Sequence, residues 1–170
     1  GRWRLGSVQH AKAAIHSGTV CHWPTVARNR LPQIDKKGGM MAARKRVFVS
    51  FDIDHDDGAK KMLAGQAKLP DSPFDFKDNS VKYHLTGDWQ EKVRRRMGNV
   101  DIVIVLCGTK THTATGVAAE LTIAKEKKKP YFLLAAYSDK QCTKPSTATS
   151  SDKVYKWTWP NLKSLISGKR

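Results

Sequence analysis

Two short apolar runs close together in the chain constrain its fold more than any other feature. Residues 101–107 read Asp-Ile-Val-Ile-Val-Leu-Cys, and residues 131–136 read Tyr-Phe-Leu-Leu-Ala-Ala. Runs of this length are typical of strands that are buried on both faces of a parallel sheet. Between them, a hydroxyl-rich loop over 109–116 leads into a helical stretch over 117–128, which Pro130 ends. This part of the chain therefore predicts a strand, a helix and a second strand.

The same alternation extends to both sides of that unit. The other predicted elements are a strand over 46–51, a helix over 57–68 capped by Asp56 or Asp57, a short strand over 74–76, a helix over 89–97 capped by Asp88, and a helix over 161–166 with Pro160 at its start. Loops over 79–87 and 138–152 separate some of them. Strands that alternate with helices predict an α/β fold, a flavodoxin-like three-layer sandwich with a mostly parallel sheet of four or five strands.

The N-terminal quarter lacks any such pattern. Residues 1–45 have no stable hydrophobic period, and we expect a disordered or loosely attached basic tail before a domain over 46–166 and a C-terminal tail over 167–170. Met40-Met41 directly precedes the first predicted strand, so an authentic start at that point is one alternative interpretation of the tail. A basic arm that binds nucleic acid is another.

The positive charge is unevenly distributed. The net charge is +16, and residues 1–46 contribute +9 of it from 10 Lys and Arg and one Asp. The remaining 124 residues contribute +7, and their basic residues lack the interleaved aromatics of a groove for single-stranded nucleic acid. Nucleic-acid binding therefore ranks last among the functions considered.

Other classes are disfavoured by what the composition lacks. The three cysteines, Cys21, Cys107 and Cys142, are too widely spaced for a disulfide framework or a zinc site. No apolar run approaches the roughly 20 residues of a membrane span, and no signal-peptide core is visible, so we expect a cytoplasmic protein with no membrane partner. The sequence has neither a Walker A motif nor a Gly-x-Gly-x-x-Gly motif, which disfavours ATP hydrolysis and nicotinamide-dependent oxidoreduction.

One carboxylate lies where a ligand would bind. Open parallel sheets bind ligands beyond the carboxyl ends of their strands. Glu120 lies in the first turn of the helix that follows strand 101–107, and is therefore the candidate catalytic residue. The alternative is a structural role, in which the carboxylate complements the helix dipole.

Several segments together resemble one family. Residues 46–51, Arg-Val-Phe-Val-Ser-Phe, are followed by an acidic turn and resemble the opening strand of TIR domains. Residues 100–108, 118–124 and 128–132 resemble the TIR segment that carries a helix glutamate. The whole of 46–166 is similar to the TIR-like group that includes the ThsB-type sensors of the bacterial Thoeris antiphage system, and the spacing of 12 between Gly108 and Glu120 agrees with that group. One position departs from the pattern, because many TIR domains have Trp four residues before this glutamate, where this chain has Gly116.

The resemblance implies chemistry at the nicotinamide–ribose bond of NAD, with Glu120 as the catalytic residue. NAD would be the substrate and no cofactor would be needed. The products would be nicotinamide and ADP-ribose, or a cyclic ADP-ribose-type signal. Nicotinamide leaves the pyridinium as a neutral molecule, so a second carboxyl to protonate it is unnecessary. One carboxylate that stabilises the oxocarbenium-like sugar suffices.

The end of the first strand supplies further candidates for substrate binding. Ser50, Phe51, Asp52 and Asp54 follow that strand and face the same crevice by topology. An aromatic ring there can stack on a base, and an aspartate can bind ribose hydroxyls. The alternative assigns Phe51 to the core and the acidic residues to a turn.

Three more candidates lie elsewhere in the chain. Trp89 fits a core position or a platform for a ligand. Thr111 and Thr113 can donate to a phosphate or can belong to a solvated loop. His112, in the same loop, lacks a helical partner for metal binding, so no metal site is predicted.

Three functions fit these observations. The first is a TIR-like enzyme that consumes NAD in antiphage defence, associates with itself through TIR-like surfaces and reaches an effector through a nucleotide signal. The second is a non-catalytic TIR-like self-association module in which Glu120 is structural. The third is a nucleoside or nucleotide glycosyl-transferring enzyme of related architecture, which can also use a single glutamate.

Overall fold

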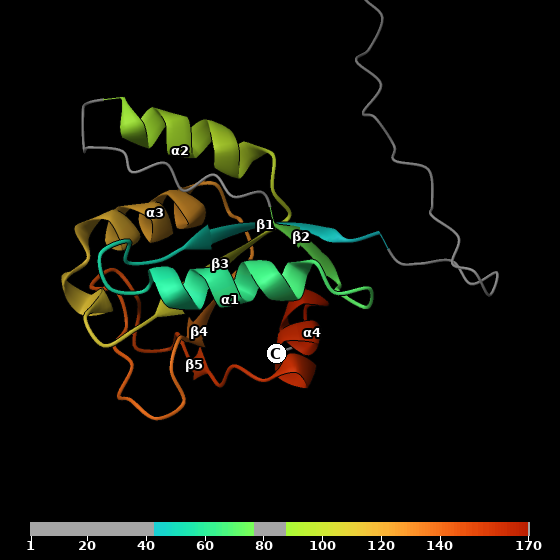
Figure 1. The fold of residues 1–170 in the computed structure, drawn as a ribbon. Coiled ribbons are helices and arrows are strands. Elements are labelled where there is room, and N and C mark those ends of the chain that lie inside the picture. Colours follow the sequence, from blue (N-terminus) through green and yellow to red (C-terminus); the bar gives the residue numbers. More distant parts are fainter. Residues whose placement is uncertain (1–42, 77–87, 170) are drawn as a thin grey trace, which may run out of the picture. The chain divides into compact units, whose positions relative to one another are not determined.

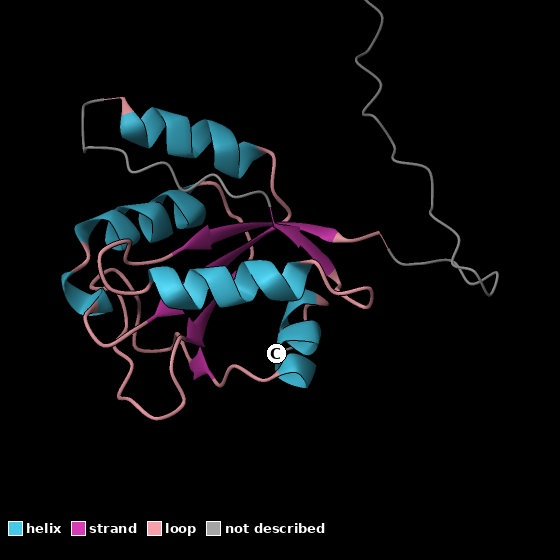
Figure 2. Ribbon diagram, viewed as in Figure 1, coloured by secondary structure: helices cyan, strands magenta, loops and turns pink. Residues whose placement is uncertain are grey.

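The computed structural model describes residues 43–76 and 88–169. The predicted tail over 1–45 and the predicted loop over 79–87 lie almost entirely outside the described residues, and both stay predictions. Within the described part, a central sheet is covered by helices on both faces (Figures 1 and 2). The predicted three-layer α/β sandwich is confirmed.

The strands of the described part form one five-stranded, entirely parallel sheet. They are β1 (Lys45–Ser50), β2 (Phe74–Phe76), β3 (Ile102–Cys107), β4 (Tyr131–Ala135) and β5 (Val154–Tyr155), in the spatial order β2-β1-β3-β4-β5. This is the flavodoxin-like order that the sequence predicts. β5 was not predicted, because two ordered residues are too short to produce a period-2 pattern.

Helices α1 (Asp57–Ala67) and α4 (Trp159–Ile166) cover one face of the sheet, and α2 (Trp89–Gly98) and α3 (Thr115–Glu126) cover the other (Figure 1). Each pair buries its own cluster of apolar side chains. The first core, on the α1 and α4 face, includes Val47, Val49, Leu63, Phe74, Ile104 and Leu162. The second core, on the α2 and α3 face, includes Phe48, Met97, Val105, Cys107 and Leu121.

Strand β3 shows why these residues form a central strand. All six of its residues are buried, and successive side chains alternate between the two cores. A strand covered by helices on both faces needs apolar residues at every position, which explains the continuous run in the sequence. β1 alternates in the same way, so Ser50, two residues after Phe48, faces the second core.

The order of the strands places a crevice at one end of the sheet. After β1 the chain passes outward to β2, and it later returns to form β3 on the other side of β1. The connections that leave the carboxyl ends of β1 and β3 therefore diverge to opposite sides, and ligands of such folds bind at this point. Ser50 and Val105 are the last residues that pair between β1 and β3.

The start of α3 corrects the sequence prediction. A short 3-10 helix, η1 (Thr111–Thr113), precedes it, and α3 begins at Thr115, two residues earlier than predicted. Thr115 and Gly116 are poor helix formers, but both belong to the helix, because the extended residue Ala114 directly before them is its N-cap. Glu120 therefore lies in the second turn of α3, where a helix-dipole role carries less weight.

Among residues 43–76 and 88–169, no helix combines the length and apolar character that a membrane crossing requires.

Candidate active site

A hydrogen bond between two distant side chains defines the candidate site. The Ser50 hydroxyl, at the end of β1, donates to Oε2 of Glu120 on α3 over 2.5 Å. Ser50 is fully buried and Glu120 is half-buried. The two residues are 70 positions apart in the sequence, and the pair joins the carboxyl end of β1 to the helix that follows β3. It therefore lies beside the crevice that the strand order creates.

The surroundings of Glu120 change its ionisation. Burial disfavours the charged form and raises the pKa of its carboxyl from 4.5 to about 7. The hydrogen bond from Ser50 opposes that rise, as does, more weakly, the positive charge of Arg96 on α2. The pKa of Glu120 therefore lies near neutral pH, a shift of the kind that is common among groups at functional sites.

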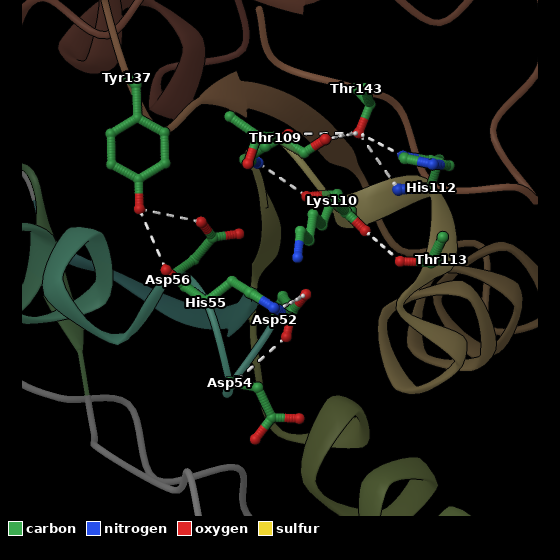
Figure 3. Close-up of polar contacts among 12 residues, drawn as sticks. Asp52, Asp54, His55, Asp56, Thr109, Lys110, His112, Thr113, Tyr137 and Thr143 are labelled. Atoms are coloured by element: carbon green, nitrogen blue, oxygen red, sulfur yellow. Dashed lines mark hydrogen bonds and ion pairs between the residues drawn. The ribbon is translucent and has the colours of Figure 1, made fainter. Parts of the chain in front are cut away.

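The loop after β1 folds around Asp52. Asp52 is buried, and its carboxylate accepts from the backbone N–H of Asp54 at 3.1 Å. The other carboxylate oxygen pairs with Nδ1 of His55 at 2.8 Å. Figure 3 shows this pair beside the end of β1. These bonds fix a tight turn directly after the carboxyl end of β1.

A second buried carboxyl ties three segments together. Asp56 accepts from the hydroxyl of Tyr137, a residue that follows β4, at 3.0 Å (Figure 3). Its carboxyl also lies against Gly108 at the end of β3. Asp56 is 1% exposed, and burial raises its pKa, while Tyr137 and Thr111 oppose that rise. Although Asp56 occupies the N-cap position of α1, its side chain makes no capping bond. The predicted N-cap position of Asp56 is confirmed, but no side-chain capping bond forms, and one oxygen of the carboxylate accepts from Tyr137.

A comparison with known families identifies the chain. The family model described as "Thoeris protein ThsB, TIR-like domain" matches residues 48–142, more than half of the chain and inclusive of both Ser50 and Glu120. The chain belongs to the ThsB TIR-like family. No curated protein matches the chain. The family resemblance read from the sequence is confirmed.

The structure brings some of the predicted site residues of this ThsB-type domain together and separates others. Ser50 and Glu120 are in direct contact. Asp54 is exposed next to the buried Asp52. Phe51 is half-buried and packs against the first core, on the opposite face of the sheet from Glu120, with the Lys60 ammonium 5.7 Å from its ring centroid.

The other predicted contacts lie on α2 and in the loop after β3. Trp89 is half-buried and packs against the second core. Thr111 is buried, and its Oγ1 accepts from the Gly108 N–H at 2.7 Å. Thr113 is exposed and donates to the Lys110 carbonyl at 2.8 Å. Both hydroxyls make bonds within their own loop, and a role for these three residues in ligand binding stays a prediction.

Two further residues of this site were not predicted from the sequence, which gave little signal for either of them. Arg96 lies among three consecutive arginines on α2, a pattern that indicates a solvated face, and its effect on Glu120 depends on the packing of α2 beside α3. Tyr137 directly follows the predicted strand over 131–136, so its place at the carboxyl end of a parallel strand was the one hint of its contact with Asp56.

Proposed function

We propose that this ThsB-type domain cleaves the nicotinamide–ribose bond of NAD with Glu120 as its catalytic residue. The observation that carries the proposal is the Ser50–Glu120 hydrogen bond, which holds a half-buried carboxyl at the crevice where such folds bind nucleotides. Membership of a TIR-like family supports the same reading.

The reaction needs one carboxylate. The bond between the ribose C1′ and the pyridinium nitrogen breaks, and nicotinamide leaves with the bonding electron pair as a neutral molecule. The positive charge passes to the ribose, where an ionised Glu120 stabilises it. Water then adds to C1′ and releases a proton to give ADP-ribose, or a nucleophile of the same nucleotide adds and closes a cyclic product.

The experiment compares two glutamates of the same helix. Glu120→Gln keeps the size of the side chain and removes its charge, and we expect it to lower the rate of NAD cleavage by about a hundredfold or more. Glu126→Gln is the matched control, because Glu126 is an exposed residue of α3 that pairs with Arg94 at 3.5 Å.

The readout is the loss of NAD and the appearance of nicotinamide, followed by mass spectrometry in phage-challenged bacteria that express each variant. Unchanged NAD loss in Glu120→Gln would remove Glu120 from the catalytic role. A wild type that consumes no NAD after challenge would instead favour the self-association module.

The proposal includes the use of the product and the assembly of the domain. A nucleotide product acts as a signal to a separate effector, and copies of the domain associate with one another to reach full activity. Purified protein should then gain specific activity as its concentration rises. A specific activity that is independent of concentration would contradict the assembly part alone.

A further inference from the structure

A buried hydroxyl interrupts the apolar face of β1. Ser50 is fully buried, faces the second core like Phe48 two residues before it, and is paired in register with the buried Val105. A hydroxyl taken out of water without a hydrogen-bond partner destabilises the folded protein. A residue such as Val or Ala would fill this position without that cost, so the hydroxyl calls for a specific partner.

That partner is Glu120. The Ser50 hydroxyl donates to Oε2 at 2.5 Å, the length of a short, charge-assisted bond. Oε1 of Glu120 makes no hydrogen bond to the residues in 43–76 and 88–169. The carboxylate is thus anchored through one oxygen, from the side of the sheet.

We propose that Ser50 is a positioning residue, whose buried hydroxyl anchors Oε2 of Glu120 and keeps the carboxylate ionised, with Oε1 left to meet the substrate. Because Ser50 is fully buried beneath Glu120, it acts through that carboxylate and does not touch the substrate. The inference rests on the proposed NAD chemistry for its catalytic meaning, but its physical content can be measured without NAD.

The ionisation of Glu120 depends on opposing effects on the pKa of its carboxyl. Burial raises the pKa of Glu120, and the Ser50 hydrogen bond is the larger of the two causes that lower it, ahead of Arg96. Without this bond, the desolvated carboxyl would hold its proton at neutral pH. A protonated carboxyl has no charge with which to stabilise an oxocarbenium-like ribose.

The chain offers a direct measurement. It contains three glutamates, Glu91, Glu120 and Glu126, so the full chain labelled with carbon-13 at the glutamate carboxyl gives three carboxyl signals, and Glu120→Gln identifies the one that matters. We expect this signal to titrate near pH 7 in the wild type. In Ser50→Ala it should titrate about one pH unit higher, because a hydrogen bond to a charged group is lost.

The matched control is another buried serine. Ser72 is 4% exposed, and its hydroxyl donates to the Phe74 carbonyl at 3.0 Å. Ser72→Ala loses a buried hydroxyl as Ser50→Ala does, and its Glu120 signal should titrate as in the wild type. Melting temperatures of both variants show that they are folded.

Activity provides the second readout. With NAD as substrate, Ser50→Ala should lower kcat about tenfold near neutral pH, with little change in KM, and should move the acid limb of the pH–rate profile upward by the same interval as the titration. A Glu120 signal that titrates alike in Ser50→Ala and the wild type would overturn the inference, whatever the activity. Absence of NAD cleavage by the wild type, with the titration shifted as expected, would overturn the proposed function and leave the anchoring of Glu120 supported.

Discussion

Two carboxyls near the same end of the sheet differ in their surroundings. Burial raises the pKa of both Glu120 and Asp56. Glu120 is half-buried and is anchored through one oxygen by the Ser50 hydroxyl. Asp56 is 1% exposed, bonded to Tyr137 and packed against the backbone of Gly108.

A raised pKa therefore marks burial and does not by itself mark function. Asp56 fills the space between the segments that follow β1, β3 and β4, so its carboxyl holds these three segments together. Glu120 keeps part of its surface exposed, so its carboxyl can meet a ligand. Substitutions around Asp56 test its structural role, and substitution of Glu120 tests its role toward a ligand.

The largest expected effect comes from filling the space that Asp56 occupies. A Cβ at Gly108 would collide with both carboxylate oxygens of Asp56. Gly108→Ala must displace a buried, hydrogen-bonded side chain, and we expect it to lower the free energy of unfolding by about 3 kcal/mol, measured by urea denaturation.

A second glycine controls for the change in backbone freedom. Gly65 is exposed within α1, and a Cβ there meets nothing within 4 Å. Gly65→Ala should stabilise the protein by about 0.5–1 kcal/mol. If Gly108→Ala were as well tolerated, Asp56 would not be held in place, and the contrast with Glu120 would disappear.

The next effect concerns the stability cost of the candidate catalytic charge. In the folded chain the pKa of Glu120 is about 7, against 4.5 for an unperturbed glutamate. Between these values the folded state binds more protons than the unfolded state, so stability falls as pH rises from about 4.5 to about 7. Above pH 7 the full cost of the buried charge is present.

Glu120→Gln should therefore be more stable than the wild type at pH 8 by about 2 kcal/mol, and nearly equal to it at pH 4.5. Urea denaturation at the two pH values measures both differences. A variant that loses both NAD cleavage and this pH dependence would show that the reactive group is held at a cost to stability. A destabilised variant at pH 8 would contradict the burial of the charge.

The smallest effect tests the bond that holds Asp56. Tyr137→Phe removes the hydroxyl that favours the charged form of Asp56, and we expect a loss of about 1–2 kcal/mol at pH 8. The loss should be smaller at pH 4, where Asp56 is protonated to a greater extent. The Glu120 carboxyl signal should titrate as in the wild type, and a shift there would show that the two carboxyls are coupled.

The sequence predicted the parts of the fold that depend on long, regular patterns. The strands β3 and β4 were predicted from their continuous apolar runs, because strands buried on both faces of a parallel sheet have this local pattern. Glu120 was singled out because it follows the carboxyl end of such a strand. The start of α3 was misplaced by two residues, because an extended residue at Ala114 decided it against the helix propensities of Thr115 and Gly116.

The contacts of the site were not readable in the same way. Ser50 was predicted to bind substrate, but its bond to Glu120 depends on the register of β1 with β3 and on how α3 packs across the sheet. The effect of Arg96 on Glu120 arises from the packing of two helices. Such contacts join residues far apart in the sequence, and no local pattern records them.

The separation of 70 positions between Ser50 and Glu120 has a consequence for synthesis of the chain. Both halves of the pair must have left the ribosome, and the central strand β3 between them must have inserted, before the carboxylate can be anchored. A truncated or partly folded chain would hold a glutamate with neither the burial nor the hydroxyl that tune it. The Ser50–Glu120 pair would thus form only once β1, β3 and α3 have come together in the finished sheet.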